Sequence, residues 1–148
     1  MENYSVLMSV YYKEQAENLR EAIDSILNQT VKTNEFIIVK DGPLTEKLDN
    51  TIKEYVEEYP GVFKIVTLKK NMGLAKALNK GIEQCSNEII ARMDSDDISM
   101  PDRMERQLEA MEANRADILS GTIVEFDESV DKPTAKRELP EKNEQIIE

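Results

Sequence analysis

Three aspartates within four residues, Asp94, Asp96 and Asp97, are the residues of this sequence whose types and spacing could do chemistry. They follow an apolar run in the stretch EIIARMDSDDISMPDRM, residues 88–104. Like charges at this spacing repel one another, and the 148-residue chain already has a formal net charge of −11. Some interaction must therefore offset the repulsion. A bound cation, a solvated turn and a set of helix caps are the three alternatives.

The cation alternative follows from the ligand preferences of hard metals. Mg²⁺ and Mn²⁺ prefer carboxylate and phosphate oxygens and often take only one or two protein carboxylates. The Asp94-x-Asp96 pair could supply them, although a D-x-D pattern alone is a weak signal. An EF-hand calcium loop fits less well, because Ile98 and Ser99 stand where that loop needs a ligand and a turn glycine. A non-enzymatic calcium-binding module therefore stays as the alternative of a different class.

The composition excludes several kinds of chemistry. The chain has no histidine, which removes histidine-activated nucleophiles and histidine-bound zinc. Cys85 is its only cysteine, which excludes an internal disulfide and fits a reducing compartment. The acidic balance argues against a nucleic-acid partner, because such surfaces need Lys and Arg to displace phosphate counterions. No apolar run approaches the roughly 20 residues that span a bilayer.

The segments that must position the aspartates alternate between short apolar runs and apolar residues at helical spacing. Short apolar runs predict strands over Tyr4–Val10, Phe36–Val39, Phe63–Leu68 and Glu88–Met93. Apolar residues at helical spacing predict helices over Lys13–Leu27, Leu48–Tyr59 and Leu74–Cys85. This order predicts an α/β fold, a Rossmann-like doubly wound and mostly parallel sheet with helices on both faces.

After Asp97 the regular alternation of predicted strands and helices ends. Ser99 and Asp102 form a capping-box pattern with Pro101 in the first turn, which predicts another helix. Ala116–Phe126 predicts one or two strands broken at Gly121. Pro140–Glu148 resembles the first turns of a helix, so we expect the C-terminus to be a boundary inside a longer protein.

Ligands of open α/β sheets bind outside the carboxyl ends of the parallel strands. The aspartate cluster follows the fourth predicted strand, and the other three strands end in Ser9–Tyr12, Lys40–Pro43 and Lys69–Gly73. The glycine-rich loops that usually cradle phosphates are missing. A metal held by Asp94 and Asp96 is then the physical alternative for binding a diphosphate.

Four stretches, in the right order and at suitable spacing, resemble the family 2 glycosyltransferases, inverting enzymes of the GT-A fold that use nucleotide-diphosphate sugars. They are SVLMSVYYKE, FIIVKDGP, NMGLAKALNKGI with its N-x-G-x-x-x-A-x-N pattern, and RMDSDDISMPDRMERQ, together spanning about Ser5 to Gln107. SGTIVEFD fits the strand that follows. The resemblance implies a sugar donor, which we expect to be UDP-linked, a saccharide or lipid-linked acceptor, and Mg²⁺ or Mn²⁺ as cofactor.

The resemblance also implies roles for the residues that would bind the nucleotide. Asp41 would accept a hydrogen bond from the base, since uracil presents an imide N–H. Ser9 and Tyr11 would contact the base or the ribose. Asn71 is a further nucleotide-binding candidate, with a turn as its alternative role. Lys40 stands where the family commonly has a first aspartate, and it could instead touch an anionic group.

The aspartate cluster takes its roles from the same resemblance. Asp94 would face the ribose and the metal shell, and Asp96 would ligate the cation that bridges the diphosphate. Asp97 would lie just outside these ligands. The metal would stabilise the negative charge that builds on the leaving nucleoside diphosphate.

The acceptor side of the expected enzyme is incomplete. We expect residues 1–148 to be a single glycosyltransferase domain cut short, with the nucleotide-sugar and metal-binding half in 1–107 and the start of the acceptor half in 116–148. The general base is then expected beyond Glu148, and this chain would bind donor and metal but transfer sugar poorly. The family implies a cytoplasmic enzyme, working on a lipid-linked acceptor at the inner membrane face. A face left open by the missing half would favour a homodimer.

Overall fold

The computed structural model of the chain describes residues 3–114, 122–126 and 133–138. Residues up to Asp102 form one compact unit, and the chain from Arg103 onward belongs to another. The first unit alternates strands and helices in the order β1 (Tyr4–Val10), α1 (Ala16–Leu27), β2 (Glu35–Lys40), α2 (Glu46–Glu58), β3 (Phe63–Thr67), α3 (Leu74–Ile82) and β4 (Ile89–Arg92).

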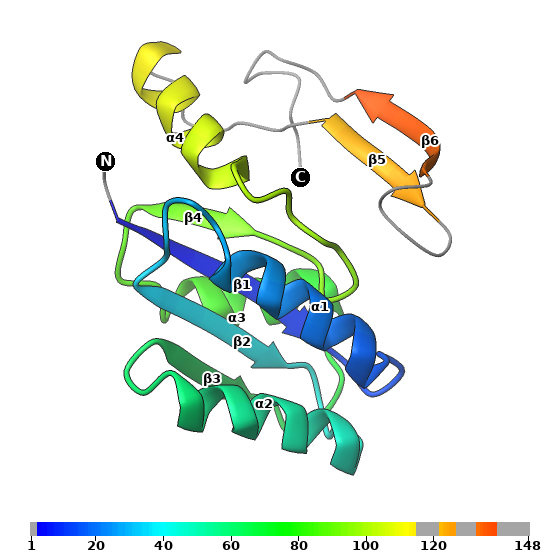
Figure 1. Ribbon diagram of the computed structural model, residues 1–148. Coiled ribbons are helices and arrows are strands. Elements are labelled where there is room, and N and C mark those ends of the chain that lie inside the picture. Colours follow the sequence, from blue (N-terminus) through cyan, green and yellow to red (C-terminus); the bar gives the residue numbers. More distant parts are fainter. Residues whose placement is uncertain (1–2, 115–121, 127–132, 139–148) are drawn as a thin grey trace. The chain divides into compact units, whose positions relative to one another are not determined.

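The four strands of the first unit form one parallel sheet in the order β3-β2-β1-β4. Helices α1 and α2 lie on one face and α3 on the other (Figure 1). This arrangement follows from right-handed crossovers, since the chain moves outward from β1 to β3 and then returns to β4. The doubly wound α/β fold expected from the sequence is confirmed.

The register aligns the carboxyl ends of three strands. Val10 of β1 lies beside Lys40 of β2, and Lys40 lies beside Thr67 of β3. On the other side Leu7 lies beside Arg92, so β4 ends three residues earlier than β1. The loops that follow these strands are therefore brought to one edge of the sheet.

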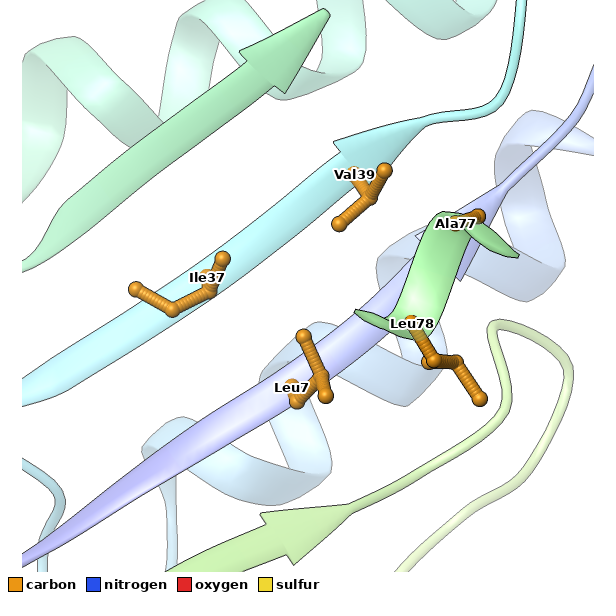
Figure 2. Close-up of a cluster of buried hydrophobic side chains, with 5 residues drawn as sticks. All are labelled: Leu7, Ile37, Val39, Ala77 and Leu78. Carbon is orange, nitrogen blue, oxygen red and sulfur yellow. The ribbon is translucent and has the colours of Figure 1, made fainter. Parts of the chain in front are cut away.

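The α3 face of the sheet is closed by a compact apolar cluster (Figure 2). The strands contribute Leu7, Ile37 and Val39, and the helix contributes Ala77 and Leu78. Gly81 lets α3 approach closely, because an added Cβ would collide with Leu7 and lie 2.7 Å from Val39 Cγ2. The opposite face packs apolar side chains of α1 and α2 against the strands, among them Leu19, Ile23, Ile26, Leu48 and Ile52.

A buried carboxylate holds the amino edge of the sheet. Glu35, at the start of β2, accepts hydrogen bonds from Ser5 Oγ at 2.6 Å and from the Ser86 N–H at 2.7 Å. Lys64 Nζ lies 2.7 Å from its other oxygen. Burial alone would raise the pKa of Glu35, but the hydrogen bonds from Lys64, Ser5 and Ser86 outweigh it and lower the pKa from 4.5 to about 2. This network joins β1, β2, β3 and the loop before β4.

Two helix starts differ from the sequence prediction. Helix α1 begins at Ala16 instead of Lys13, because the Glu14 N–H donates to the Tyr11 carbonyl and closes a turn first. The helix predicted after Ser99, with Pro101 in its first turn, begins later, since α4 spans Arg103–Asn114. The Ser99 hydroxyl donates to Met93 Sδ at 3.6 Å.

The second unit contains α4 and an antiparallel pair of strands, β5 (Thr122–Phe126) and β6 (Pro133–Glu138). The predicted strand of Ala116–Phe126 is present from Thr122 onward, and its break at Gly121 lies outside the described residues, as does the helix expected over Pro140–Glu148. Strand β6 was not predicted, because its sequence PTAKRE has few apolar residues. No helix in residues 3–114 combines the length and the apolar character that crossing a bilayer requires.

Candidate functional site

A cleft of about 530 Å³ opens at the carboxyl edge of the sheet. The six residues predicted to bind the nucleotide or the metal line it, namely Ser9, Tyr11, Asp41, Asn71, Asp94 and Asp96, whereas Asp97 is not among its lining residues. They come from the end of β1 and from the loops after all four strands, which explains why one cleft can collect residues as far apart in sequence as Ser9 and Asp96. The lining is completed by Lys13, Glu14, Gln15, Asn18, Gly73, Leu74 and Ser95. The roles of these residues stay predictions, but their meeting at one place is a property of the fold.

Asp41 is the most deeply set carboxylate of the cleft, with 4% of its surface exposed. It follows the last residue of β2, and its Oδ1 accepts a hydrogen bond from the Met72 N–H at 2.7 Å. The next residue, Gly42, has φ +90°, and an added Cβ would lie 2.6 Å from the Asn71 backbone nitrogen. The β2–α2 and β3–α3 loops are therefore in backbone contact, and Asp41 holds them together.

Asn71 has a clear local structural role. Its Oδ1 accepts a hydrogen bond from the Gly73 N–H at 3.1 Å, which forms an Asx turn just before α3. Gly73 has φ +93°, a conformation that L side chains rarely adopt, and it is the residue from which α3 begins. The turn role expected as the alternative for Asn71 is therefore present, and its exposed side chain also borders the cleft.

Aromatic surface borders the cleft on the β1 side. Tyr11 is 44% exposed and meets Tyr12 edge to face, with 5.9 Å between ring centroids. Lys13 Nζ lies 5.8 Å from the centroid of the Tyr12 ring. An exposed ring beside a cleft can stack on a planar ligand, so the geometry suits contact with a nucleobase.

The aspartate cluster forms a tight turn. The Asp97 N–H donates to the Asp94 carbonyl at 3.1 Å, which brings one carboxylate oxygen from each of Asp94, Asp96 and Asp97 within 4.8 Å of the others. The turn follows β4, whose continuation at Met93 is hydrogen-bonded to the Leu7 carbonyl of β1. Three exposed carboxylates at this spacing match the donor set that Mg²⁺ and Mn²⁺ prefer.

The charges of the cleft also favour a cation. Four carboxylates line it, from Glu14, Asp41, Asp94 and Asp96, whereas Lys13 is the one cationic side chain among the described lining residues. A diphosphate would be repelled by this surface without an intermediary. A divalent cation would remove that obstacle, so the residues present fit such an ion.

Two of the lining residues, Glu14 and Ser95, were missed by the sequence analysis. The Ser95 hydroxyl donates a 2.5 Å hydrogen bond to Glu14 Oε2 across 81 residues of sequence. Ser95 was visible only as the middle of D-x-D, and Glu14 only as an acidic residue in a predicted helix. The position of Glu14 just after the first predicted strand was the one signal that could have drawn attention to it.

Lys40, which the sequence suggested could touch an anionic group, pairs with a carboxylate of the protein. Its Nζ forms an ion pair with Asp49 Oδ1 of α2 at 2.9 Å, and Lys40 is not among the residues that line the cleft. The anionic group that Lys40 touches in this structure is thus the Asp49 carboxylate of α2. Lys40 differs from Asp41 in this respect because it ends β2 on the face covered by α2, whereas Asp41 starts the loop at the edge.

The parallel sheet with a carboxyl-edge cleft and a D-x-D turn defines a GT-A type nucleotide-sugar transferase fold. A family model described as Glycosyl transferase family 2 matches residues 5–147. The chain belongs to that family. The resemblance seen in the four sequence stretches is thereby confirmed.

Curated relatives of the chain are named as glycosyltransferases. The chain is 44% identical over 144 residues to the amylovoran biosynthesis glycosyltransferase AmsE of Erwinia amylovora, covering 97% of this chain and 53% of the relative. It is 38% identical over 141 residues to an Escherichia coli UDP-Gal:alpha-D-GlcNAc-diphosphoundecaprenol beta-1,3-galactosyltransferase, covering 95% and 50%. The chain thus spans about half the length of these relatives.

Solved structures share the fold. S. aureus TarS 1-349 in complex with UDP superposes with a TM-score of 0.67 at 20% identity, over 81% of this chain and 36% of that one. The mannosyltransferase PcManGT of Pyrobaculum calidifontis, in complex with GDP-Man and Mn²⁺, gives 0.66 at 21% identity, over 82% and 34%. At these identities the likeness concerns the fold alone.

Proposed function

We propose that the cleft binds a nucleotide-diphosphate sugar, with UDP as the expected nucleotide, and that Asp94 and Asp96 hold the divalent cation that accompanies it. The observation that carries this proposal is the meeting of Asp41 and the aspartate turn in one cleft at the carboxyl edge of the sheet. Deeply set Asp41 suits recognition of a base N–H, and exposed Asp94 and Asp96 suit a hydrated ion. The ligand class is supported by a relative that uses UDP-Gal and by two structural neighbours, one in complex with UDP and one with GDP-Man and Mn²⁺.

The residues of the cleft would act by binding and orienting. Asp41 accepts the imide N–H of the base, and the exposed Tyr11 ring covers its face. Ser9 is placed beside Asp41 at the end of β1 to reach the base or the ribose. Asp94 and Asp96 would hold the cation, which would supply Lewis-acid stabilisation of the charge that develops on the leaving diphosphate.

The whole reaction would be transfer of the sugar, with inversion, to a saccharide or lipid-linked acceptor. The names of the Erwinia and Escherichia relatives, one in polysaccharide biosynthesis and one acting on a diphosphoundecaprenol-linked sugar, support this acceptor class. We propose that the general base lies beyond Glu148, because Glu125, Asp127 and Glu128 do not stand in a sequence context that matches the base of this family. A lipid-linked acceptor would put the enzyme at the cytoplasmic face of a membrane.

A calorimetric titration tests the donor proposal. UDP, UDP-galactose, UDP-N-acetylglucosamine and GDP are each titrated into the chain with and without Mn²⁺. We expect UDP and at least one UDP-sugar to bind only with Mn²⁺, and GDP to bind at least tenfold more weakly. Equal affinity for UDP and GDP would contradict the assignment of Asp41 as the base-reading residue, and absence of binding by all four would contradict the donor site.

A further inference from the structure

Ser95 stands between the two proposed metal ligands and points a different way. Asp94 and Asp96 are exposed, whereas Ser95 is only 7% exposed and its hydroxyl donates to Glu14 Oε2 at 2.5 Å. We propose that Glu14 is a positioning residue for the metal site. By accepting the Ser95 hydrogen bond, it fixes the turn that presents Asp94 and Asp96 to the cation. This inference rests on the proposed function of the aspartate turn.

The turn of Asp94–Asp97 needs a hydrogen bond such as Ser95–Glu14 to hold its middle in place. Before it, Met93 is bonded through its N–H to the Leu7 carbonyl at 3.1 Å, and after it the Ser99 N–H donates to Ser25 Oγ at 3.0 Å. Between these anchors, three carboxylates within 4.8 Å repel one another and push the turn open while no cation is bound. The Ser95 bond resists that repulsion at the residue between the ligands.

Glu14 is itself held firmly enough to serve as the anchor. Its Oε1 accepts from the Gln15 N–H at 2.9 Å and from Asn18 Nδ2 at 3.4 Å, and its own N–H donates to the Tyr11 carbonyl at 3.1 Å. Both carboxylate oxygens therefore have protein donors, which argues that Glu14 acts through Ser95 instead of ligating the metal directly. A hydrogen bond to an ionised carboxylate is also about twice as strong as a neutral one.

The same bond links the two halves of the cleft. Glu14 belongs to the β1–α1 loop, which carries Tyr11 on the proposed nucleotide side, and Ser95 belongs to the metal turn. A shift of either loop changes the Glu14–Ser95 distance. We therefore expect loss of this bond to weaken the binding of Mn²⁺ more than the binding of UDP at saturating Mn²⁺.

The first test is the Mn²⁺ affinity at saturating UDP, measured by calorimetry on Ser95→Ala, Glu14→Ala and the double variant. Each single variant should bind Mn²⁺ about tenfold more weakly, as is typical when a group that orients a metal ligand is removed. The double variant should be no weaker than the singles, because both remove the same bond. Glu17→Ala, which removes an exposed carboxylate from the first turn of α1 outside the cleft, is the matched control and should bind like the native chain.

Glu14→Gln tests whether Glu14 acts by its hydrogen bond to Ser95 or by its negative charge. The glutamine keeps an oxygen that accepts from Ser95 but loses the negative charge, so its Mn²⁺ affinity should stay within about threefold of the native value. If Glu14→Gln were as weak as Glu14→Ala while Ser95→Ala bound normally, Glu14 would act through its charge and the positioning role would be overturned.

A metal-free measurement keeps this inference distinct from the proposed function. The Asp97 N–H is bonded to the Asp94 carbonyl, so its hydrogen exchange reports on the turn itself. Without any ligand, Ser95→Ala should exchange this amide several times faster than the native chain and Glu17→Ala. An unchanged rate would overturn the positioning role, whereas a native chain that binds neither UDP nor Mn²⁺ would overturn the donor site.

Discussion

The carboxylate of Asp41, at the end of β2, accepts a hydrogen bond from the backbone N–H of Met72, with 2.7 Å between Oδ1 and nitrogen. The two residues are 31 positions apart, and the bond joins the loops that follow neighbouring strands. One oxygen of Asp41 thus holds the wall of the cleft, and the residue still lines the cleft itself. Structural and recognition roles can therefore be separated by choice of substitution.

Asp41→Asn should keep the fold and lose nucleotide affinity. The amide oxygen can still accept from Met72, so the free energy of unfolding should change by less than about 1 kcal/mol. UDP affinity in the presence of Mn²⁺ should fall about tenfold or more, because the charged acceptor for the base is lost. Asp41→Ala should also lose UDP affinity. Its free energy of unfolding should fall by a further 1–2 kcal/mol or so, because alanine cannot accept the hydrogen bond from Met72. Unchanged UDP affinity in Asp41→Asn, measured by calorimetry, would remove Asp41 from base recognition.

Gly42→Ala should be more destabilising than Gly61→Ala. Both glycines have positive φ, +90° and +85°, so alanine is strained at either position by about 1–2 kcal/mol. Only at position 42 does an added Cβ meet the backbone, 2.6 Å from the Asn71 nitrogen, whereas nothing lies within 4 Å at position 61. We expect an additional cost of about 1–3 kcal/mol for Gly42→Ala in urea unfolding. Equal costs would show that the two loops are not in close contact.

Lys40→Ala should leave nucleotide binding unchanged. The Lys40 ammonium is paired with Asp49 at 2.9 Å and does not line the cleft, so UDP affinity with Mn²⁺ should stay within about twofold of the native value. Asp49→Ala, which removes the other partner, is the matched control and should behave alike. A tenfold loss in Lys40→Ala alone would place its ammonium on the ligand.

Glu35 should make stability depend on pH in the acid range. Its pKa is about 2 in the folded chain and 4.5 in the unfolded reference, so ionised Glu35 stabilises the fold above pH 4.5. That stabilisation, at most about 3 kcal/mol, is lost as the pH falls from about 4.5 to 2. Glu35→Gln should therefore flatten the unfolding free energy in this window.

Glu57→Gln is the control for that experiment, since it neutralises an exposed carboxylate on α2. Its unfolding free energy should follow the native dependence on pH. The same steep dependence in Glu35→Gln would show that other carboxylates carry the effect. Because Glu35 lies at the amino edge of the sheet, its substitution should leave UDP binding with Mn²⁺ intact.

The sequence was sufficient for the sheet and for the residues at its carboxyl edge. Apolar runs such as Phe36–Val39 specify buried parallel strands, and the rule that parallel strands end at a common edge brings Asp41 and Asp94 together. Both inferences depend on local patterns of four to seven residues. That is why the parallel sheet, and the meeting of these residues at its carboxyl edge, agree with what the pattern predicts.

Contacts between distant polar residues could not be foreseen in this way. Glu14 and Ser95 are 81 positions apart, and neither belongs to a pattern that points to the other. The sequence suggested an anionic partner for Lys40 but did not identify it as Asp49 of α2. Side-chain partners of this kind are set by how elements pack, and the one-dimensional sequence does not contain that information in readable form.

The central claim is that the aspartate turn holds a cation which allows a nucleoside diphosphate to bind. Thermal unfolding of the native chain and of Asp96→Ala, with UDP, with Mn²⁺ and with both, tests it most directly. Ligand at about 100 times its dissociation constant adds roughly 2.7 kcal/mol, which is several degrees in melting temperature for a chain of this size. We expect that shift for the native chain only with UDP and Mn²⁺ together, and none for Asp96→Ala. An equal shift in Asp96→Ala, or a shift with Ca²⁺ alone that is indifferent to UDP, would contradict the account.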